Sequence, residues 1–419
     1  MYLTKIAWRN LKRNPSRTGI AVAAIALVVV IVVFSRGFIV GMTDSMFSTY
    51  IDNSLGHVRI VDEDYKLREA LLPLDYLVDG LDDGGASDMV ARLSQLPEVN
   101  YILPRVQFGA MATEGDRLIR MLGIGTDMSV EARHGVLPGD LAEGRLPEAS
   151  DEILVGSGIL RDLSASVGDR VTLVFADYYQ SLRGKTFTIV GVRDSGISEL
   201  DNHLFYLPLS TAQDMLWLED EVTELLVFGS HADGADTLHT AISGLLNADG
   251  SERYAVTAWN RGDGLIELYS EAQNIMILVY ILFIAMGSVV IVSAMAMIVR
   301  ERTGEIGMMG SLGLKSRDIL TIFLMEGVFM GVVGSALGTL LGGVITWIWS
   351  RTGIRVEAFA DLVSEVELLV QPVFYPAFNL ENLLVSFGLA VLVVTVACLY
   401  PAWQAAKLEP VEALRYAEH

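Results

Sequence analysis

Four long apolar stretches interrupt an otherwise mixed sequence, and each is long enough for a helix to cross a lipid bilayer. A membrane-spanning helix needs about 20 consecutive, mostly apolar residues. The first stretch follows a basic segment, as in a signal peptide, but it is longer than the usual apolar region of about 7 to 15 residues. The pattern therefore predicts four transmembrane helices, at residues 18–42, 273–299, 319–350 and 382–401.

The basic residues beside these stretches predict the orientation, because Lys and Arg collect in short cytoplasmic segments. Five basic residues and no acidic one occupy segment 1–17, and four more basic residues lie in the loop 300–318. Both segments are therefore expected in the cytoplasm, together with the tail 402–419. Residues 43–272 and the loop 351–381 are expected to face outward.

Segment 1–17 also has the pattern of an amphipathic helix, with Leu3 and Ile6 on one face and basic residues on another. Such a helix lies flat at the membrane interface. The pair Asn14 and Pro15 resembles a helix cap followed by proline at the first helical position, which predicts the start of the first span.

The segment 43–272 mixes strand-like and helix-like patterns and is long enough for one or two small α/β modules. Its clearest strands are expected at 152–156, 170–175 and 186–192, and its clearest helices at 86–96 and 210–218. The predicted fold class is an α-helical membrane protein with four transmembrane helices and a large α/β extracytoplasmic domain between the first two.

Charge is distributed very unevenly along the chain, whose formal net charge is −21. Residues 39–273 hold 39 Asp and Glu against 16 Lys and Arg, so this one segment carries the whole acidic excess. Such a surface disfavours nucleic acid and anionic lipid as its partners. The only cysteine, Cys398, lies in an apolar stretch and is expected to be a small buried hydrophobic residue.

The third span contains a stripe of small residues, which lets another helix backbone approach closely. Packing against a neighbouring span and a dimer seam both fit this pattern. Glu326, at the cytoplasmic entrance of the same span, is expected to snorkel or cap rather than to relay protons. The glycines of the stripe are Gly327, Gly331, Gly334, Gly338 and Gly342.

No catalytic, metal-binding or cofactor-binding residues are predicted. The segment Arg183-Gly-Lys-Thr186 ends like a phosphate-binding loop, but its first glycine is missing and a strand follows. Asp201 and His203 are interpreted as a solvated surface pair, because the histidines are scattered and no zinc-binding pattern occurs. Nor does the sequence contain a nucleophile elbow. It therefore does not predict an enzyme.

Two cytoplasmic segments, residues 300–319 after the second span and 400–415 in the tail, carry motifs that resemble those of MacB/FtsX-like ABC transporter permeases, the type VII family. The loop Arg300-Glu-Arg-Thr-Gly-Glu-Ile-Gly-Met-Met-Gly-Ser-Leu-Gly-Leu-Lys-Ser-Arg-Asp-Ile319 is similar to the family's loop after the second span. The tail Tyr400-Pro-Ala-Trp-Gln-Ala-Ala-Lys-Leu-Glu-Pro-Val-Glu-Ala-Leu-Arg415 is similar to its C-terminal motif. The outward segment resembles the MacB-like periplasmic core domain, and Leu55-Gly-His-Val-Arg-Ile60 resembles lipoprotein-releasing permeases of the Lol type.

The resemblance implies a bacterial inner-membrane permease that works by mechanotransmission. Such permeases dimerise, as two copies or with a paralogue, and dock two cytoplasmic ATPase subunits that bind ATP and Mg²⁺. Because no ATPase domain precedes the first span here, the ATPase is expected to be another polypeptide. Extraction or export of an amphipathic substrate such as a lipoprotein is the leading hypothesis. FtsX-like activation of a periplasmic partner and MacB-like drug or peptide efflux are the alternatives.

The loop 300–318 would then be the coupling helix that docks onto the ATPase, rather than an ordinary connection. Its glycines weaken an isolated helix by about 1 kcal/mol each, so docking is expected to hold it. Gly313 is expected to end the helix, and Ser316 to cap the next one with Asp318 in its first turn. The apolar docking contact is assigned to Ile306, Met308, Met309 and Leu312, and its polar rim to Arg302, Glu305 and Lys315.

Overall fold

In a computed structural model of the chain, each of the four apolar stretches lies in a long helix. The predicted amphipathic helix at 1–17 falls largely outside the described residues, as do outer-loop residues 356–372 and the tail beyond Lys407. The structure describes residue 9 and residues 15–81, 84–114, 117–248, 253–261, 264–355 and 373–407.

The chain divides into two units, which are described separately. The helical unit comprises residues 1–44, 270–355 and 373–419. The α/β unit comprises residues 45–269 and 356–372.

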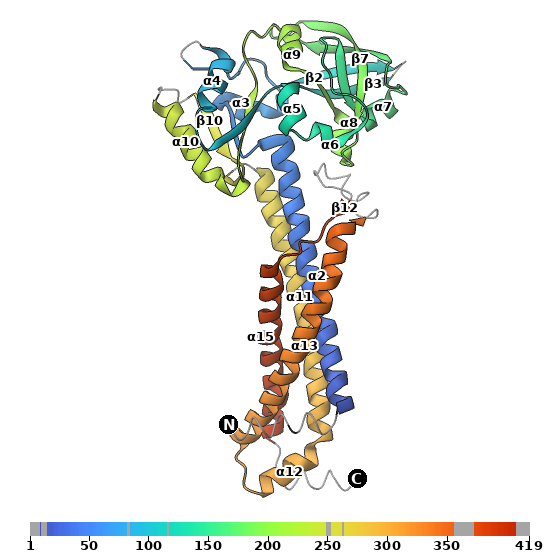
Figure 1. The fold of residues 1–419 in the computed structure, drawn as a ribbon, viewed down its shortest axis with the longest axis vertical. Helices are drawn as coiled ribbons and strands as arrows, with labels where there is room; N and C mark the ends of the chain where they lie inside the picture. The colour runs from blue at the N-terminus through green and yellow to red at the C-terminus, as the bar shows by residue number, and fades with distance from the viewer. Residues whose placement is uncertain are drawn as a thin grey trace. The chain divides into compact units, whose positions relative to one another are not determined.

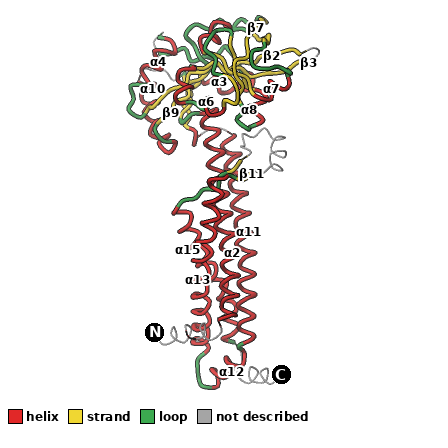
Figure 2. Tube along the Cα trace, turned by 45° about the vertical axis from the view of Figure 1, so that its right-hand side comes forward, coloured by secondary structure: helices red, strands yellow, loops and turns green. Residues whose placement is uncertain are grey.

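Four long helices lie side by side in the helical unit (Figure 1, Figure 2). By length and composition, all four can cross a membrane, over Thr18–Leu55, Ile277–Glu301, Ser316–Thr352 and Leu380–Ala406. Helix α2 is described from Pro15 onward, and each of the four long helices extends past its predicted span. A two-stranded ribbon, β11 (Ile354–Arg355) and β12 (Val373–Phe374), follows the third long helix. The helices are α2 (Pro15–Tyr50), α11 (Gly264–Glu301), α12 (Thr303–Ser311), α13 (Ser316–Thr352) and α15 (Leu380–Ala406).

The core of the helical unit is built from small and branched side chains. Ile25 and Val29 of α2 pack there with Met330 of α13 and Val394 of α15. Cys398 is fully buried in the same cluster, as expected from its apolar surroundings.

Ten strands form the sheet of the α/β unit, and six of them pair in a closed circuit, β2-β3-β8-β5-β7-β6 and back to β2. The β3–β8 and β5–β7 pairs are parallel, and the other pairs are antiparallel. Strands β9, β1 and β10 extend the sheet from β2 on its other side. The strands are β1 (Val58–Asp62), β2 (Val99–Glu114), β3 (Arg117–Thr126), β4 (Leu141–Gly144), β5 (Glu152–Gly156), β6 (Arg170–Ala176), β7 (Leu182–Arg193), β8 (Leu204–Pro208), β9 (Glu224–Gly229) and β10 (Tyr254–Ala258).

Short helices cover this sheet, and Figure 1 shows α4 and α10 near β10 and α7 and α8 near the closed circuit. Alternating strand residues such as Leu225 and Val227 of β9 point into one large apolar core with residues of α4 and α10. The helices are α3 (Glu63–Arg68), α4 (Gly85–Leu93), α5 (Met128–His134), α6 (Leu137–Asp140), α7 (Ser157–Asp162), α8 (Ser198–His203), α9 (Leu209–Leu216) and α10 (Ala235–Ala248).

The predicted strands are confirmed as β5, β6 and β7, and the predicted helices as α4 and α9, with ends that differ by a few residues. The segment 183–186, which resembles the end of a phosphate-binding loop, lies within strand β7. This agrees with the strand predicted there. The surface position predicted for Asp201 is wrong. Its carboxylate is buried and accepts hydrogen bonds from the backbone N–H and the hydroxyl of Ser195. Burial raises the pKa of this carboxyl group.

Candidate coupling site

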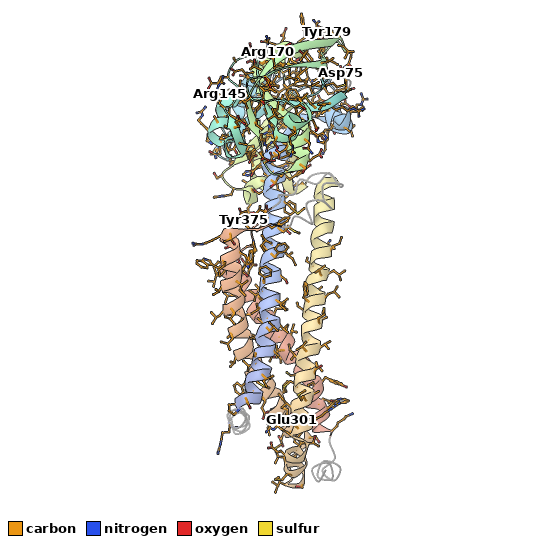
Figure 3. All side chains as sticks on the ribbon, turned by 90° about the vertical axis from the view of Figure 1, so that its right-hand side faces the viewer. Asp75, Arg145, Arg170, Tyr179, Glu301 and Tyr375 are labelled. Carbon is orange, nitrogen blue, oxygen red and sulfur yellow. The ribbon has the colours of Figure 1, made fainter. Side chains whose placement is uncertain are left out.

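The loop 300–318 contains a separate short helix, α12, set off from α11 by a corner at Arg302. Figure 3 labels Glu301, the last residue of α11, beside this corner. The Thr303 hydroxyl donates to the Arg300 carbonyl at 2.7 Å, which satisfies one of the carbonyls that α11 leaves unpaired. Glu305 lies in the first turn of α12, where the helix dipole favours a negative charge.

Gly313 ends α12, as predicted. Its φ of +91° is a left-handed conformation that glycine adopts without steric cost. The Gly313 N–H donates to the Gly310 carbonyl at 3.0 Å, and the Leu314 N–H donates to the Met309 carbonyl at 3.2 Å. This pair of bonds is a Schellman motif.

The predicted cap of the next helix is shifted by one residue. Ser316 is the first residue of α13, and Lys315 occupies the N-cap position. The Asp318 carboxylate accepts a bond from the Lys315 backbone N–H at 3.4 Å. The first turn is therefore stabilised by the carboxylate of Asp318 rather than by the Ser316 hydroxyl.

One face of α12 packs inside the protein. Ile306 is 1% exposed and lies in a cluster with Phe323 of α13 and Ala402 of α15, and Met309 is partly buried against the same cluster. The assignment of Ile306 to the docking contact is therefore wrong, because its side chain is already covered within the chain.

The other face of α12 exposes apolar side chains. Met308 is 55% exposed, and Leu312, at the C-cap, is 76% exposed. The exposed residues Gly313 and Lys315 follow directly in the sequence. Of the residues predicted to form the apolar docking contact, Met308 and Leu312 thus remain available at the surface.

Arg302, assigned to the polar rim, forms a partly buried network within the chain. Its Nη1 donates to Glu326 Oε2 at 2.6 Å, its Nε donates to Glu305 Oε2 at 2.9 Å, and its guanidinium lies 5.4 Å from the centre of the Phe323 ring. Glu326 is 2% exposed, so its predicted snorkelling or capping role is replaced by an ion pair. The pair links the corner before α12 to α13.

The glycine stripe of α13 faces two other helices of the same chain. At Gly327 and Gly331, an added Cβ atom would lie 2.7 Å from Cys398 and Val394 of α15. At Gly338 it would lie 2.6 Å from the Ala26 carbonyl of α2, and Gly334 and Gly342 also face α2. Within the described residues, the stripe is therefore occupied by packing inside the chain.

No group of three or more His, Cys, Asp or Glu able to hold a metal ion occurs among the residues that the structure describes. The site thus combines an exposed apolar face, at Met308 and Leu312, with the Arg302–Glu326 ion pair on the covered side.

Two family models match the chain. The model of the MacB-like periplasmic core domain matches residues 18–243, more than half of the chain, and the model of the FtsX-like permease C-terminal region matches residues 277–410. The chain belongs to the MacB/FtsX-like family of ABC transporter permeases. The resemblance of the loop and tail motifs is thereby confirmed.

Relatives of this permease carry lipoprotein-related names. The lipoprotein-releasing system transmembrane protein LolC of Xylella fastidiosa is 26% identical over 336 residues, 76% of this chain and 78% of that protein. LolC of Neisseria meningitidis is 25% identical over 421 residues, 96% of this chain and 93% of that protein. Among solved structures, the periplasmic region of MacB from Actinobacillus actinomycetemcomitans is 14% identical with a TM-score of 0.35, covering 51% of this chain and 92% of that one.

Proposed function

We propose that this permease couples ATP hydrolysis by a separate ATPase subunit to the extraction or export of an amphipathic substrate such as a lipoprotein. Two relatives that align over most of their length are named as lipoprotein-releasing transmembrane proteins, which supports this substrate class. In this proposal the complex contains two ATPase subunits and a second permease, either another copy or a paralogue. ATP and Mg²⁺ bind to the ATPase subunits, and this chain supplies no catalytic residue.

The exposed face of α12 is the observation that supports this proposal most directly. Met308 and Leu312 lie on the helix that joins α11 to α13, beside basic residues that favour the cytoplasmic side. Their apolar surface is what a partner protein would cover. Ile306, on the buried face, would transmit a push on α12 directly to α13 and α15.

A single charge on this face tests the docking role. Leu312→Asp removes an exposed apolar contact and adds a charge that must be desolvated on binding, so affinity for the ATPase should fall about tenfold or more. Leu67→Asp is a matched control, because Leu67 of α3 is 79% exposed in the α/β unit. Co-purification of the ATPase with each full-length variant is the measurement. Equal recovery with Leu312→Asp and with the unchanged chain would exclude Leu312 from the contact.

The substrate class is tested with purified permease and ATPase in proteoliposomes. A fluorescent lipopeptide carrying three acyl chains should leave the membrane only when ATP is hydrolysed. ATP hydrolysis without lipopeptide release, but with activation of a co-purifying cell-wall hydrolase, would favour the FtsX-like alternative. Expulsion of a soluble macrolide or peptide instead would favour the MacB-like efflux alternative.

A further inference from the structure

The helical segment that leads into the α/β unit ends in an unusual way. After Tyr50, residues Ile51–Leu55 form a π-helical turn, which Gly56 ends with a φ of +61°. A Cβ atom at Gly56 would lie 3.2 Å from both Leu226 and Val227 of β9, so the chain passes close to the sheet here. Single π-turns are rare and frequently mark functional positions.

Asn53, in the middle of this turn, is held at its backbone and at both ends of its side chain. Its carbonyl oxygen accepts a bond from Arg105 Nη1 at 2.6 Å, and its Oδ1 accepts one from Arg193 Nη2 at 2.6 Å. Its Nδ2 donates to the Thr49 carbonyl at 2.8 Å, one turn earlier. Two guanidinium groups thus bind one neutral residue.

Each of these arginines is buried and is also bound to the body of the α/β unit. Arg105 of β2 pairs with Glu131 of α5 at 3.1 Å. Arg193, at the end of β7, pairs with Asp140 of α6 at 2.7 Å. Figure 1 shows α5 and α6 beside the end of this helical segment.

Arg193 makes a further bond that fixes its plane, donating through Nη1 to the buried Tyr206 hydroxyl of β8. A guanidinium is suited to this arrangement because it offers several donors in one rigid plane. Both arginines lie near the last carbonyls of the helical segment, where the helix dipole favours positive charge.

These hydrogen bonds differ from ordinary surface contacts because they are charge-assisted and their arginine donors are buried. Arg105 and Arg193 are among the largest fully buried side chains of the described residues. Hydrogen bonds to charged groups contribute more than neutral ones, and a buried partner left alone is costly. The turn at Asn53 is therefore expected to move together with β2, β7, α5 and α6.

We propose that Asn53, clamped by Arg105 and Arg193, is the joint through which displacement of the first membrane helix is passed to the α/β unit. This inference rests on the proposed function, because it assumes that ATP hydrolysis displaces that helix. Asn53 is a positioning residue in this role and contacts no substrate.

Loss of the Asn53 side chain should uncouple hydrolysis from release. Asn53→Ala keeps the backbone bond to Arg105 but loses the bonds to Arg193 and Thr49. In proteoliposomes that contain the full chain and its ATPase, the amount of triacylated lipopeptide released per ATP hydrolysed should fall at least tenfold. The ATP hydrolysis rate itself should stay within twofold of the unchanged protein.

Two variants separate this role from a purely structural one. Asn53→Asp retains an oxygen that accepts from Arg193 and should restore at least half of the normal ratio. Asn260→Ala removes a single exposed hydrogen bond to Asp236 in the same unit and should leave the ratio unchanged.

Three results would overturn the proposal. Asn53→Ala could keep the normal ratio of release to hydrolysis, which would refute the role of Asn53 and leave the proposed function intact. Release and hydrolysis could fall together with the melting temperature, which makes Asn53 a structural residue. The unchanged protein could hydrolyse ATP without releasing lipopeptide, which would refute the proposed function and therefore also the role of Asn53.

Discussion

The two units bury polar groups in different ways. The α/β unit contains buried guanidinium groups, at Arg59, Arg105 and Arg193, and each is paired with at least one carboxylate. Within the described part of the helical unit, the one carboxylate that reaches the same degree of burial is Glu326, near the start of α13. Elsewhere its described helices meet through glycines that face branched apolar side chains, such as Gly331 against Val394.

The difference follows from the surroundings that each unit must satisfy. An α/β domain can bury an ion pair if its strands and helices supply hydrogen bonds to the charged groups. Such a pair fixes the local geometry more than it stabilises the fold. A membrane helix gains little from hydrophobic exclusion, so close approach of backbones supplies much of its packing energy. Charges are costly there and are kept near helix ends. The Arg302–Glu326 pair, near the start of α13, follows this pattern and links the bundle to the corner before α12.

Breaking that pair should give the largest effect on stability. Arg302→Met leaves the Glu326 carboxylate buried without its guanidinium, and removal of one partner of a buried pair costs about 3–5 kcal/mol. The free energy of unfolding, measured by denaturant titration in mixed micelles, should fall by that amount.

A double variant provides the control. Arg302→Met with Glu326→Leu removes both charges and should recover most of the lost stability, because an apolar replacement of a buried pair is often neutral. If the single variant is as stable as the unchanged chain, the pair is not desolvated and the contrast between the units weakens.

Filling the glycine stripe should have an intermediate effect. Gly338→Leu places a side chain where even a Cβ atom would lie 2.6 Å from the Ala26 carbonyl, so α2 and α13 must separate. Overpacking of this kind costs about 1–3 kcal/mol. Gly388→Leu is the matched control, since Gly388 of α15 has nothing within 4 Å of its added Cβ atom. Equal stability of the two variants, by the same titration, would show that the stripe is not a close contact.

Local patterns were sufficient to predict much of this molecule. The four spans follow from apolar runs of sufficient length, and strands such as β5 follow from short apolar runs bounded by polar residues. The end of α12 was predictable as well, because Gly313 has a conformation that few other residues adopt.

The faces of α12 were not predictable in this way. Ile306, Met308 and Leu312 are all apolar and lie on or beside a helix of nine residues. Which of them is covered depends on Phe323 and Ala402, which come from two later helices. Sequence spacing fixes the angular positions of these side chains around the helix axis. It does not determine which face of the helix packs against the bundle.

The clamp around Asn53 was missed for a related reason. Asn53 and Arg193 are 140 positions apart in the sequence, and no local motif connects them. The available signal was an arginine within or directly after an apolar strand, as in Arg105 and Arg193. Arginines are seldom buried without a partner, so such a position indicates a buried ion pair. It does not identify the residue that completes the pair.

An exposed ion pair of the α/β unit should give the smallest effect and completes the contrast. The Arg145 guanidinium, which hydrogen-bonds Glu152, lowers the pKa of that carboxyl group to about 2, with help from the backbone N–H groups of Glu148 and Ala149. A lowered folded-state pKa contributes stability above the ordinary value of 4.5, and this contribution is lost as the pH falls toward 2. Because the Arg145 side chain is half exposed, solvent screening keeps the contribution of this ion pair to stability small at neutral pH. Arg145→Ala should therefore lower the melting temperature slightly at pH 7 and hardly at pH 2. Arg170→Ala is the control, because Arg170 is also an exposed arginine (Figure 3), and it should not change the melting temperature at either pH. Thermal unfolding at both pH values measures this, and an equal loss from Arg145→Ala at pH 7 and pH 2 would mean that the side chain acts through packing rather than charge.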